Sequence, residues 1–237
     1  MFGAVAQSGN TPTMYNPIAA FDFSDTSPEN IVAAGGSVAF ARDRTGTGNN
    51  ATQSTGSVKP DTNTSTIGGL NAVYFNNGDY IDLGDVANSG SLTIITAFKP
   101  ISNSSGVASL FSADGANDFQ IDAGPSGQWM GRFNSTNLGA GSGIGIGGNF
   151  LGYTIVTTNR VSASDGNIKN RLNGVHINTD SYNGALSSPL RMRIGANRAV
   201  NTGIVMKVGE FLIFDTALTD AQMLTIETYL MNKWGIS

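Results

Sequence analysis

The sequence predicts an all-β domain, either a sandwich or a jelly roll, closed by one C-terminal α-helix. Short apolar and β-branched runs recur along the 237 residues, separated by Gly, Asn, Asp and Pro. Hydrophobic residues make up 40% of the chain and charged residues 13%, and 31 glycines suit many short strands joined by tight turns. The stretch 208–234 then passes from a continuous apolar run into a capped helix.

The C-terminal helix has the least ambiguous local code. Thr219 and Gln222 have the spacing of a capping box, in which a hydroxyl and an amide satisfy free backbone N–H groups. Gly235 suits the left-handed residue that ends a helix. We interpret Trp234 and Tyr229 as packing residues, because aromatic side chains at helical spacing usually anchor a core. The expected buried stripe is Met223, Ile226, Leu230 and Trp234.

Strands are expected wherever short apolar or alternating runs lie between turn residues. The expected strands are residues 18–23, 38–41, 72–75, 79–83, 91–98, 107–112, 118–122, 128–133, 151–158, 169–172, 175–178, 190–194 and 205–214. The three strands within 107–133 are expected to form a meander. Polar or glycine-rich stretches between strands are expected as loops. The longest are residues 42–53, 60–69 and 137–149.

Two Asn-Gly pairs predict hairpins. Asn77-Gly78 and Asn173-Gly174 each separate two apolar runs, and both residue types tolerate the positive φ angles of a two-residue turn. Pro100 is expected to end the strand before it, because proline cannot donate a backbone hydrogen bond.

Residues 1–16 are predicted to form an N-terminal arm, and residues 17–237 a single domain, because nothing resembling a linker divides the middle. Residues 1–9 lack the basic start and the apolar run of a secretory signal. The arm is small and mostly polar, and we expect it to attach the domain to a larger particle or to a neighbouring copy. The residues expected to make that contact are Met1, Phe2, Met14 and Tyr15.

Composition excludes several classes of function. The chain has no cysteine, so it can form neither a disulfide framework nor a thiolate metal site. Its net charge is −4 with scattered basic residues, whereas nucleic-acid binding needs a clustered positive surface. No apolar stretch approaches the length that spans a membrane. We therefore expect neither nucleic-acid binding nor membrane insertion.

Four stretches together resemble a known family. They are residues 38–53, with Arg42-Asp43 before a glycine-rich loop; residues 69–83; residues 172–175; and the closing strand and helix, residues 209–235. The chain is similar to concanavalin A-like jelly rolls, in particular to laminin-G-like modules of bacterial and bacteriophage surface proteins. One departure is Ala41, where the family usually has tryptophan.

The resemblance implies a jelly-roll sandwich of two antiparallel sheets with one C-terminal α-helix. It also implies recognition outside the cell or on a virion, often of glycans and sometimes with calcium. It does not imply an enzyme, because fold does not dictate function.

Catalysis is not expected. The glutamates are Glu29, Glu210 and Glu227, and none belongs to the closely spaced carboxylate array that glycoside hydrolases of this fold use. His176 has no Ser or Cys nucleophile motif near it and is interpreted as an exposed hairpin residue.

A glycan site needs an exposed aromatic ring beside amide or carboxylate groups. Trp129 is the best candidate platform, and Tyr182 with Asn183 is the second. The alternative is that Trp129 belongs to the core, as buried aromatic residues usually do.

A calcium site would need several oxygen ligands. Asp79 and Asp82, near Asn76 and Asn77, are the first candidate ligands, and Asp114, Asn117 and Asp118 form a second candidate group. The alternative is that these residues cap turns through their side chains, and neither group has the spacing of an EF-hand loop. No other cofactor is expected.

Three functions remain open. The leading hypothesis is a non-enzymatic bacteriophage virion protein (a head-decoration, fibre or tail-associated component) that presents a lectin-like jelly roll on the particle surface. It is expected to be a homo-oligomer, most simply a trimer, in contact with other virion proteins. The second is a carbohydrate-binding module that recognises cell-surface glycans. The third is a polysaccharide hydrolase or lyase.

Overall fold

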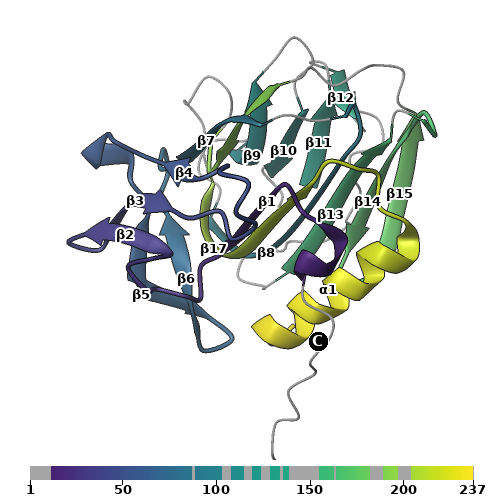
Figure 1. Ribbon diagram of the computed structural model, residues 1–237. Coiled ribbons are helices and arrows are strands. Elements are labelled where there is room, and N and C mark those ends of the chain that lie inside the picture. Colours follow the sequence, from purple (N-terminus) through teal and green to yellow (C-terminus); the bar gives the residue numbers. More distant parts are fainter. Residues whose placement is uncertain are drawn as a thin grey trace, which may run out of the picture.

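The computed structural model describes residues 12–86, 89–102, 108–114, 119–123, 129–133, 136–138, 155–162, 164–181, 189–196 and 204–236. In this part of the chain, seventeen strands form a curled antiparallel sheet, and one α-helix follows them (Figure 1). The predicted all-β class with a C-terminal helix is confirmed. No helix of the described ranges is long and apolar enough to cross a membrane.

The elements are η1 (Pro12–Tyr15), β1 (Ala19–Asp22), β2 (Ile31–Ala34), β3 (Ser37–Ala41), β4 (Ala51–Thr52), η2 (Gly56–Val58), β5 (Asp61–Ile67), β6 (Leu70–Phe75), β7 (Ile81–Val86), β8 (Leu92–Ser102), β9 (Ala108–Asp114), β10 (Phe119–Ala123), β11 (Trp129–Phe133), β12 (Thr136–Leu138), β13 (Ile155–Ser162), β14 (Asn167–Leu172), β15 (Val175–Ser181), β16 (Leu190–Ile194), β17 (Val205–Phe214) and α1 (Asp220–Trp234).

Strand β17 is the centre of the sheet. It pairs antiparallel with β1 and β6 on one side and with β8 on the other. From β8 the sheet continues through β13 and β14 to β15. Strand β9 pairs with β10 and β16, and β16 pairs with β7. The predicted meander is confirmed, since β10 pairs with both β9 and β11.

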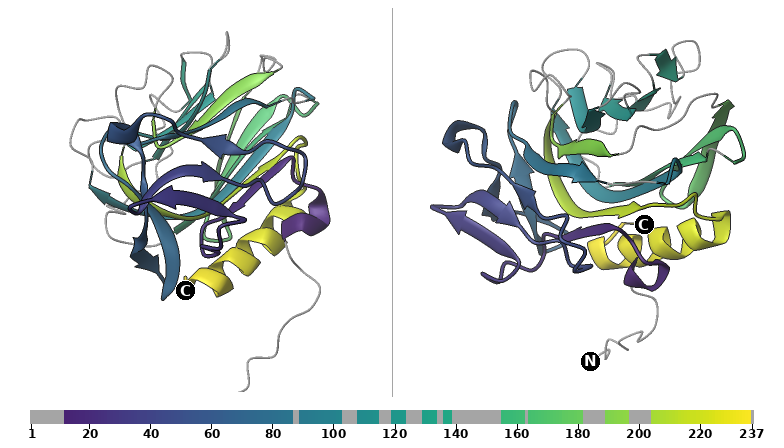
Figure 2. Two further views of the ribbon diagram at one scale, coloured as in Figure 1. Left: turned by 60° about the vertical axis from the view of Figure 1, so that its left-hand side comes forward. Right: turned by 45° about the horizontal axis from the view of Figure 1, so that its top comes forward.

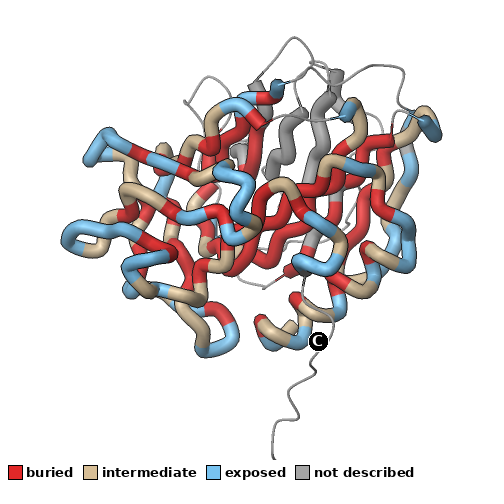
Figure 3. The backbone as a smooth tube through the Cα atoms, in the orientation of Figure 1, coloured by how far each residue is buried: buried red, intermediate tan, exposed pale blue. Residues whose placement is uncertain are grey.

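Alternation along the central strands creates two hydrophobic cores. Ile94 and Phe211 point into the first core, while Ile95 and Leu212 point into the second, as the two-residue period of a strand requires. The first core lies among the curled strands, and the second lies between the sheet and α1 (Figures 2 and 3). The second core includes Ala20, Ile95, Leu212, Phe214, Leu218, Met223, Ile226, Leu230 and Trp234.

Helix α1 begins and ends as the sequence predicts. The Thr219 side chain accepts from the Gln222 backbone N–H, and the Gln222 side chain accepts from the Thr219 backbone N–H, so the capping box is present. Gly235 has φ 66° and ends the helix in the left-handed conformation. The predicted stripe is buried against the sheet. The indole of Trp234 packs directly on Gly209 of β17, where a Cβ atom would lie 2.7 Å from the ring.

The second Asn-Gly hairpin is confirmed and the first is wrong. Strands β14 and β15 pair around Asn173 (φ 45°) and Gly174 (φ 79°). Gly78 also has a positive φ of 92°, but the strands on either side of it, β6 and β7, do not pair with each other. Strand β6 pairs with β5 and β17, and β7 pairs with β4 and β16. Because both edges of β6 are occupied, the turn after it redirects the chain to another part of the sheet.

Three further expectations are wrong. Residues 42–53 are not entirely a loop, because they contain β4. Residues 60–69 are not simply a loop: they contain β5, which reads Asp-Thr-Asn-Thr-Ser-Thr-Ile and buries only Thr62 and Ile67. Pro100 does not end its strand, because β8 continues to Ser102. Among the described strands β8 pairs only with β17 at this point, so Pro100 needs no second partner. Strand β2, which exposes three of its four residues, was not predicted.

Candidate functional site

A polar cleft of about 370 Å³ lies where the chain after β4, the start of β7 and strand β16 meet. Register explains this meeting: Thr52 of β4 and Arg193 of β16 both lie opposite Asp82 of β7. Segments far apart in the sequence therefore form one surface, which we call the polar cleft. Its lining residues are Asn50, Thr52, Gln53, Ser54, Thr55, Tyr80, Asp82, Leu83, Gly84 and Arg191.

Asp82 is the charged centre of the polar cleft. Its Oδ2 atom accepts from Arg191 Nη2 at 2.9 Å and from Arg193 Nε at 3.4 Å, because alternate residues of β16 share one face. Its Oδ1 atom accepts from the Gly84 backbone N–H at 2.8 Å. Burial alone would raise the pKa of Asp82, but the hydrogen bond from Arg191 and the other partners lower it overall. Asp82 is therefore a fixed, ionised hydrogen-bond acceptor.

Tyr80 is the aromatic residue among those that line the polar cleft. The Tyr80 carbonyl accepts from Gln53 Nε2 at 3.1 Å, and its N–H donates to the Val58 carbonyl at 3.1 Å, so its backbone is held on both sides. Gln53 is buried, and its Oε1 atom accepts from the Thr55 backbone N–H. The cleft thus combines a half-buried phenol ring, an ion pair, amides and hydroxyls. These groups can stack on a ring and exchange hydrogen bonds with a hydroxyl-rich ligand.

Asp79 and Asp82, the first candidate calcium ligands, have different hydrogen-bond partners. The Asp79 Oδ2 atom accepts from the Asn76 backbone N–H at 2.7 Å and closes the turn after β6. Burial raises the pKa of Asp79 to about 6. This is the turn-capping role that was weighed as the alternative to calcium binding. Within the described ranges, no group of three or more His, Asp or Glu side chains could hold a metal ion.

The other predicted site residues are only partly described. Met14 and Tyr15 lie on η1; Met14 is 45% exposed, and Tyr15 packs against the second core. Trp129 begins β11, but its side chain lies outside the described part of the structure. The same holds for Met1, Phe2, Tyr182 and Asn183. His176 is exposed on β15, with Nε2 3.2 Å from Thr179 Oγ1.

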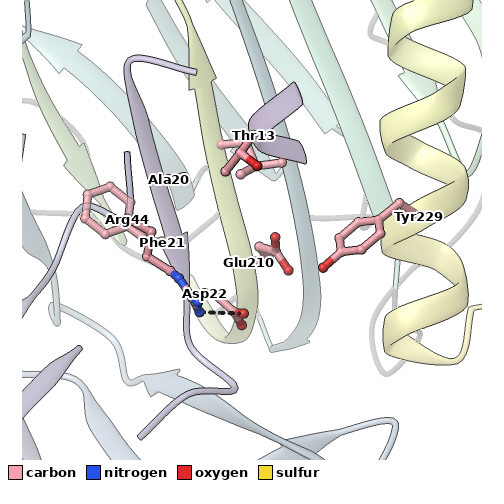
Figure 4. Close-up of a pocket in the computed structure, with 8 residues that line it drawn as sticks. Thr13, Ala20, Phe21, Asp22, Arg44, Glu210 and Tyr229 are labelled. Carbon is pink, nitrogen blue, oxygen red and sulfur yellow. Dashed lines mark hydrogen bonds and ion pairs between the residues drawn. The ribbon is translucent and has the colours of Figure 1, made fainter. Parts of the chain in front are cut away.

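A second hollow of about 180 Å³, the seam pocket, lies between β1, β17 and α1 (Figure 4). Its lining residues are Thr13, Ala20, Phe21, Asp22, Arg44, Glu210, Leu212 and Tyr229. Lys233 Nζ beside it donates to Glu210 Oε2 at 2.6 Å and lies 2.8 Å from Asp22 Oδ2. Burial raises the pKa of Glu210 to about 7, although Lys233 acts in the opposite direction.

The fold resembles domains of carbohydrate-active enzymes. Domain 4 of AbnA, an extracellular GH43 arabinanase from Geobacillus stearothermophilus solved with arabinotriose, has a TM-score of 0.63 at 17% identity. The match covers 89% of this chain and 98% of that domain. Trypanosoma rangeli sialidase in complex with sialic acid has a TM-score of 0.61 at 13% identity and covers 91% of this chain.

The NanB sialidase from Streptococcus pneumoniae has a TM-score of 0.51 at 15% identity and covers 65% of this chain. The matched regions are only 33% of the Trypanosoma chain and 27% of NanB, so this chain corresponds to one part of each sialidase. No protein-family model and no curated protein matches the chain. At these identities the likeness establishes the fold alone.

Sequence reasoning located Asp82 but not the polar cleft around it. Tyr80, Gln53 and Arg191 carry no motif, and they meet only because β4, β7 and β16 pair. The seam pocket was also missed. Glu210 was considered only as a catalytic acid, although an acidic residue inside the apolar run 208–214 is itself a signal of a buried polar contact.

Proposed function

We propose that this chain is a non-catalytic carbohydrate-binding domain and that the polar cleft is its glycan site. The observation that carries the proposal is the position of Tyr80 beside the Asp82–Arg191 ion pair in a cleft of about 370 Å³. A sugar ring offers an apolar face to an aromatic ring and hydroxyls to charged and amide groups. Because Asp82 and Gln53 are held by neighbouring residues, the cleft is formed before ligand binds.

Two proteins of similar fold support this proposal. The arabinanase domain covered almost completely by this chain was solved with arabinotriose, an oligosaccharide. A sialidase of similar fold over one third of its length was solved with sialic acid.

We further propose that the curled sheet is a jelly-roll sandwich of two sheets. Phe111 of β9 and Phe211 of β17 support it, since their ring centroids lie 5.3 Å apart in the first core. Strands β9 and β17 pair with different neighbours, so the two rings meet across the core and not along a hydrogen-bonded ladder.

A glycan array probed with wild type and three variants tests the binding proposal. Tyr80→Ala should lower the signal about tenfold, because it removes the stacking surface. Tyr74→Ala is the matched control: Tyr74 is also half-buried, lies on β6 and lines neither hollow. Trp129→Ala tests the sequence-predicted platform. Loss of signal with Trp129→Ala but not with Tyr80→Ala would place the site at Trp129, and no binding by wild type would reject the proposal.

A second proposal concerns where the carbohydrate-binding domain is located. We propose that the domain is carried on a bacteriophage particle as a homo-oligomer, most simply a trimer, with residues 1–16 as the attachment arm. The exposed Met14 at the start of the described chain supports an apolar contact there. Light scattering and particle-binding measurements of the full chain and of a chain lacking residues 1–11, which keeps Tyr15 in the second core, test it. A monomer in both cases, with unchanged particle binding, would contradict the role of the arm.

A further inference from the structure

We propose that the seam pocket is a second binding site, separate from the polar cleft, and that it takes a primary ammonium group with Glu210 as the main acceptor. The ammonium could belong to a small amine or to a lysine side chain of another protein. No residue lines both hollows, so binding in the seam pocket is independent of the proposed glycan site.

Glu210 is a buried acceptor that its neighbours do not saturate. It is only 4% exposed, and it lines the pocket between β17 and α1. Its Oε2 atom accepts from Lys233 Nζ at 2.6 Å, and the Trp234 side chain beside the carboxyl also lowers its pKa. No described residue forms a hydrogen bond of normal geometry with the Oε1 atom. A carboxylate can accept several hydrogen bonds, and a buried one left partly unsatisfied is costly. A hydrogen-bond donor that enters the pocket can therefore bind to the Oε1 atom of Glu210.

The charges around the pocket favour a cation. Three carboxylates belong to Asp22 of β1, Asp25 after it and Glu210 of β17. A fourth belongs to Asp43, whose Oδ1 atom accepts from the Ala20 backbone N–H at 3.0 Å. The facing cations are Arg44 and Lys233. With all six groups ionised, carboxylates outnumber cations by two. Helix η1 contributes the uncharged Thr13.

The remaining walls suit an alkylammonium. Leu212 and the ring of Tyr229 offer apolar contact for an alkyl stem. The Tyr229 side chain extends from α1 toward Glu210 (Figure 4). A cation held over a tyrosine ring gains a further attraction, as Lys233 Nζ already shows at 5.9 Å from the Tyr229 centroid. At about 180 Å³ the seam pocket is smaller than the polar cleft, which suits a small ligand or a single side chain.

Binding should be linked to ionisation of Glu210. Burial raises the pKa of Glu210 to about 7, so the carboxylate is mostly protonated at pH 6 and mostly ionised at pH 8. An ammonium prefers the ionised form, and its apparent affinity should therefore rise about tenfold between these two pH values, with release of a proton.

Titration calorimetry with n-butylammonium and with 1-butanol, its neutral isostere, tests the proposal. We expect the ammonium to bind at pH 8 and butanol not to bind. Glu210→Gln should weaken ammonium binding about tenfold, because it removes the charge and keeps the shape. Glu29→Gln, at an exposed site outside the pocket, should leave it unchanged. Equal binding of the two ligands, or full binding by folded Glu210→Gln, would overturn the proposal.

Two further arms complete the test. If Glu210→Gln does not fold, the wild-type pH series decides, and an affinity for butylammonium that is the same at pH 6 and pH 8 overturns the proposal. A short peptide with one lysine, amidated and acetylated at its ends, separates the two sources of the ammonium. Binding of this peptide at least as tight as that of butylammonium assigns the pocket to a protein partner, and weaker binding assigns it to small amines.

Discussion

Glu227 of α1 holds Arg171 of β14 with both carboxylate oxygens, at 3.0 Å from Arg171 Nε to Oε1 and 3.0 Å from Nη2 to Oε2. Glu227 is fully buried and the Arg171 side chain is 7% exposed, so the pair lies beneath the helix. Thr158 of β13 donates to the same Oε1 at 2.5 Å, and Arg171 Nη2 also donates to the Gly174 carbonyl at 2.7 Å. This network joins the helix to the β14–β15 hairpin.

Glu227→Gln should lower the free energy of unfolding by about 3 kcal/mol, because it leaves the Arg171 guanidinium buried without a counter-charge. Urea denaturation measures the change. Lys169→Gln is the control: Lys169 pairs with Asp220, whose side chain is 61% exposed, so its loss should cost no more than about 0.5 kcal/mol. Equal effects of the two substitutions would contradict a structural role for the buried pair.

Asp79→Asn should stabilise the protein at alkaline pH. Burial raises the pKa of Asp79 from 3.8 to about 6, so the folded state favours its protonated form. The stability of the folded protein with protonated Asp79 is fully present below about pH 4, and part of it is lost as the pH rises through 6 and the buried carboxyl ionises. Asparagine can still accept from the Asn76 N–H and never ionises. We expect a gain of about 1–2 kcal/mol at pH 8 and almost none at pH 4.

Thermal unfolding at both pH values checks this expectation for Asp79→Asn. Asp85→Asn controls for the loss of a negative charge, since Asp85 is exposed on the same strand, β7. A gain from Asp79→Asn that is the same at pH 4 and pH 8 would contradict the role given to burial.

Gly209→Ala should destabilise the protein by about 2 kcal/mol, because a Cβ atom there would lie 2.7–2.8 Å from three atoms of the Trp234 ring. The helix would have to move away from β17 to make room. Gly56→Ala is the control, since a Cβ atom at Gly56 meets no atom within 4 Å. Denaturant titration compares the two, and a Gly209→Ala protein as stable as wild type would show that α1 is not packed this tightly.

Local signals predicted the parts of the fold that local interactions determine. The capping box of Thr219 and Gln222 and the Asn173-Gly174 hairpin involve residues adjacent in sequence, and both are present. The turn at Asn77-Gly78 has the same local code, but both edges of β6 are taken by strands remote in sequence. Pairing between strands remote in sequence therefore determined where the chain goes after β6, and a two-residue pattern carries no information about such pairing.

The candidate sites depend even more on long-range pairing. The polar cleft needs Thr52, Tyr80 and Arg191 on three segments, and none of them is unusual in its own neighbourhood. Asp82 was singled out for its oxygen atoms, yet Arg191 and Arg193, which hold its carboxylate, come more than a hundred residues later. The sequence shows which chemical groups a side chain carries, but it does not show which residues the side chain will contact in the fold.

The most direct test of the central claim is to locate the bound glycan on the protein. Backbone amide signals of isotope-labelled protein should be followed by NMR as the best ligand from the glycan array is added. The polar cleft predicts the largest shifts at residues 52–55, 80–84 and 190–192, with the amides of α1 unchanged. Saturable shifts elsewhere, with these three segments unaffected, would contradict the assignment of the glycan site.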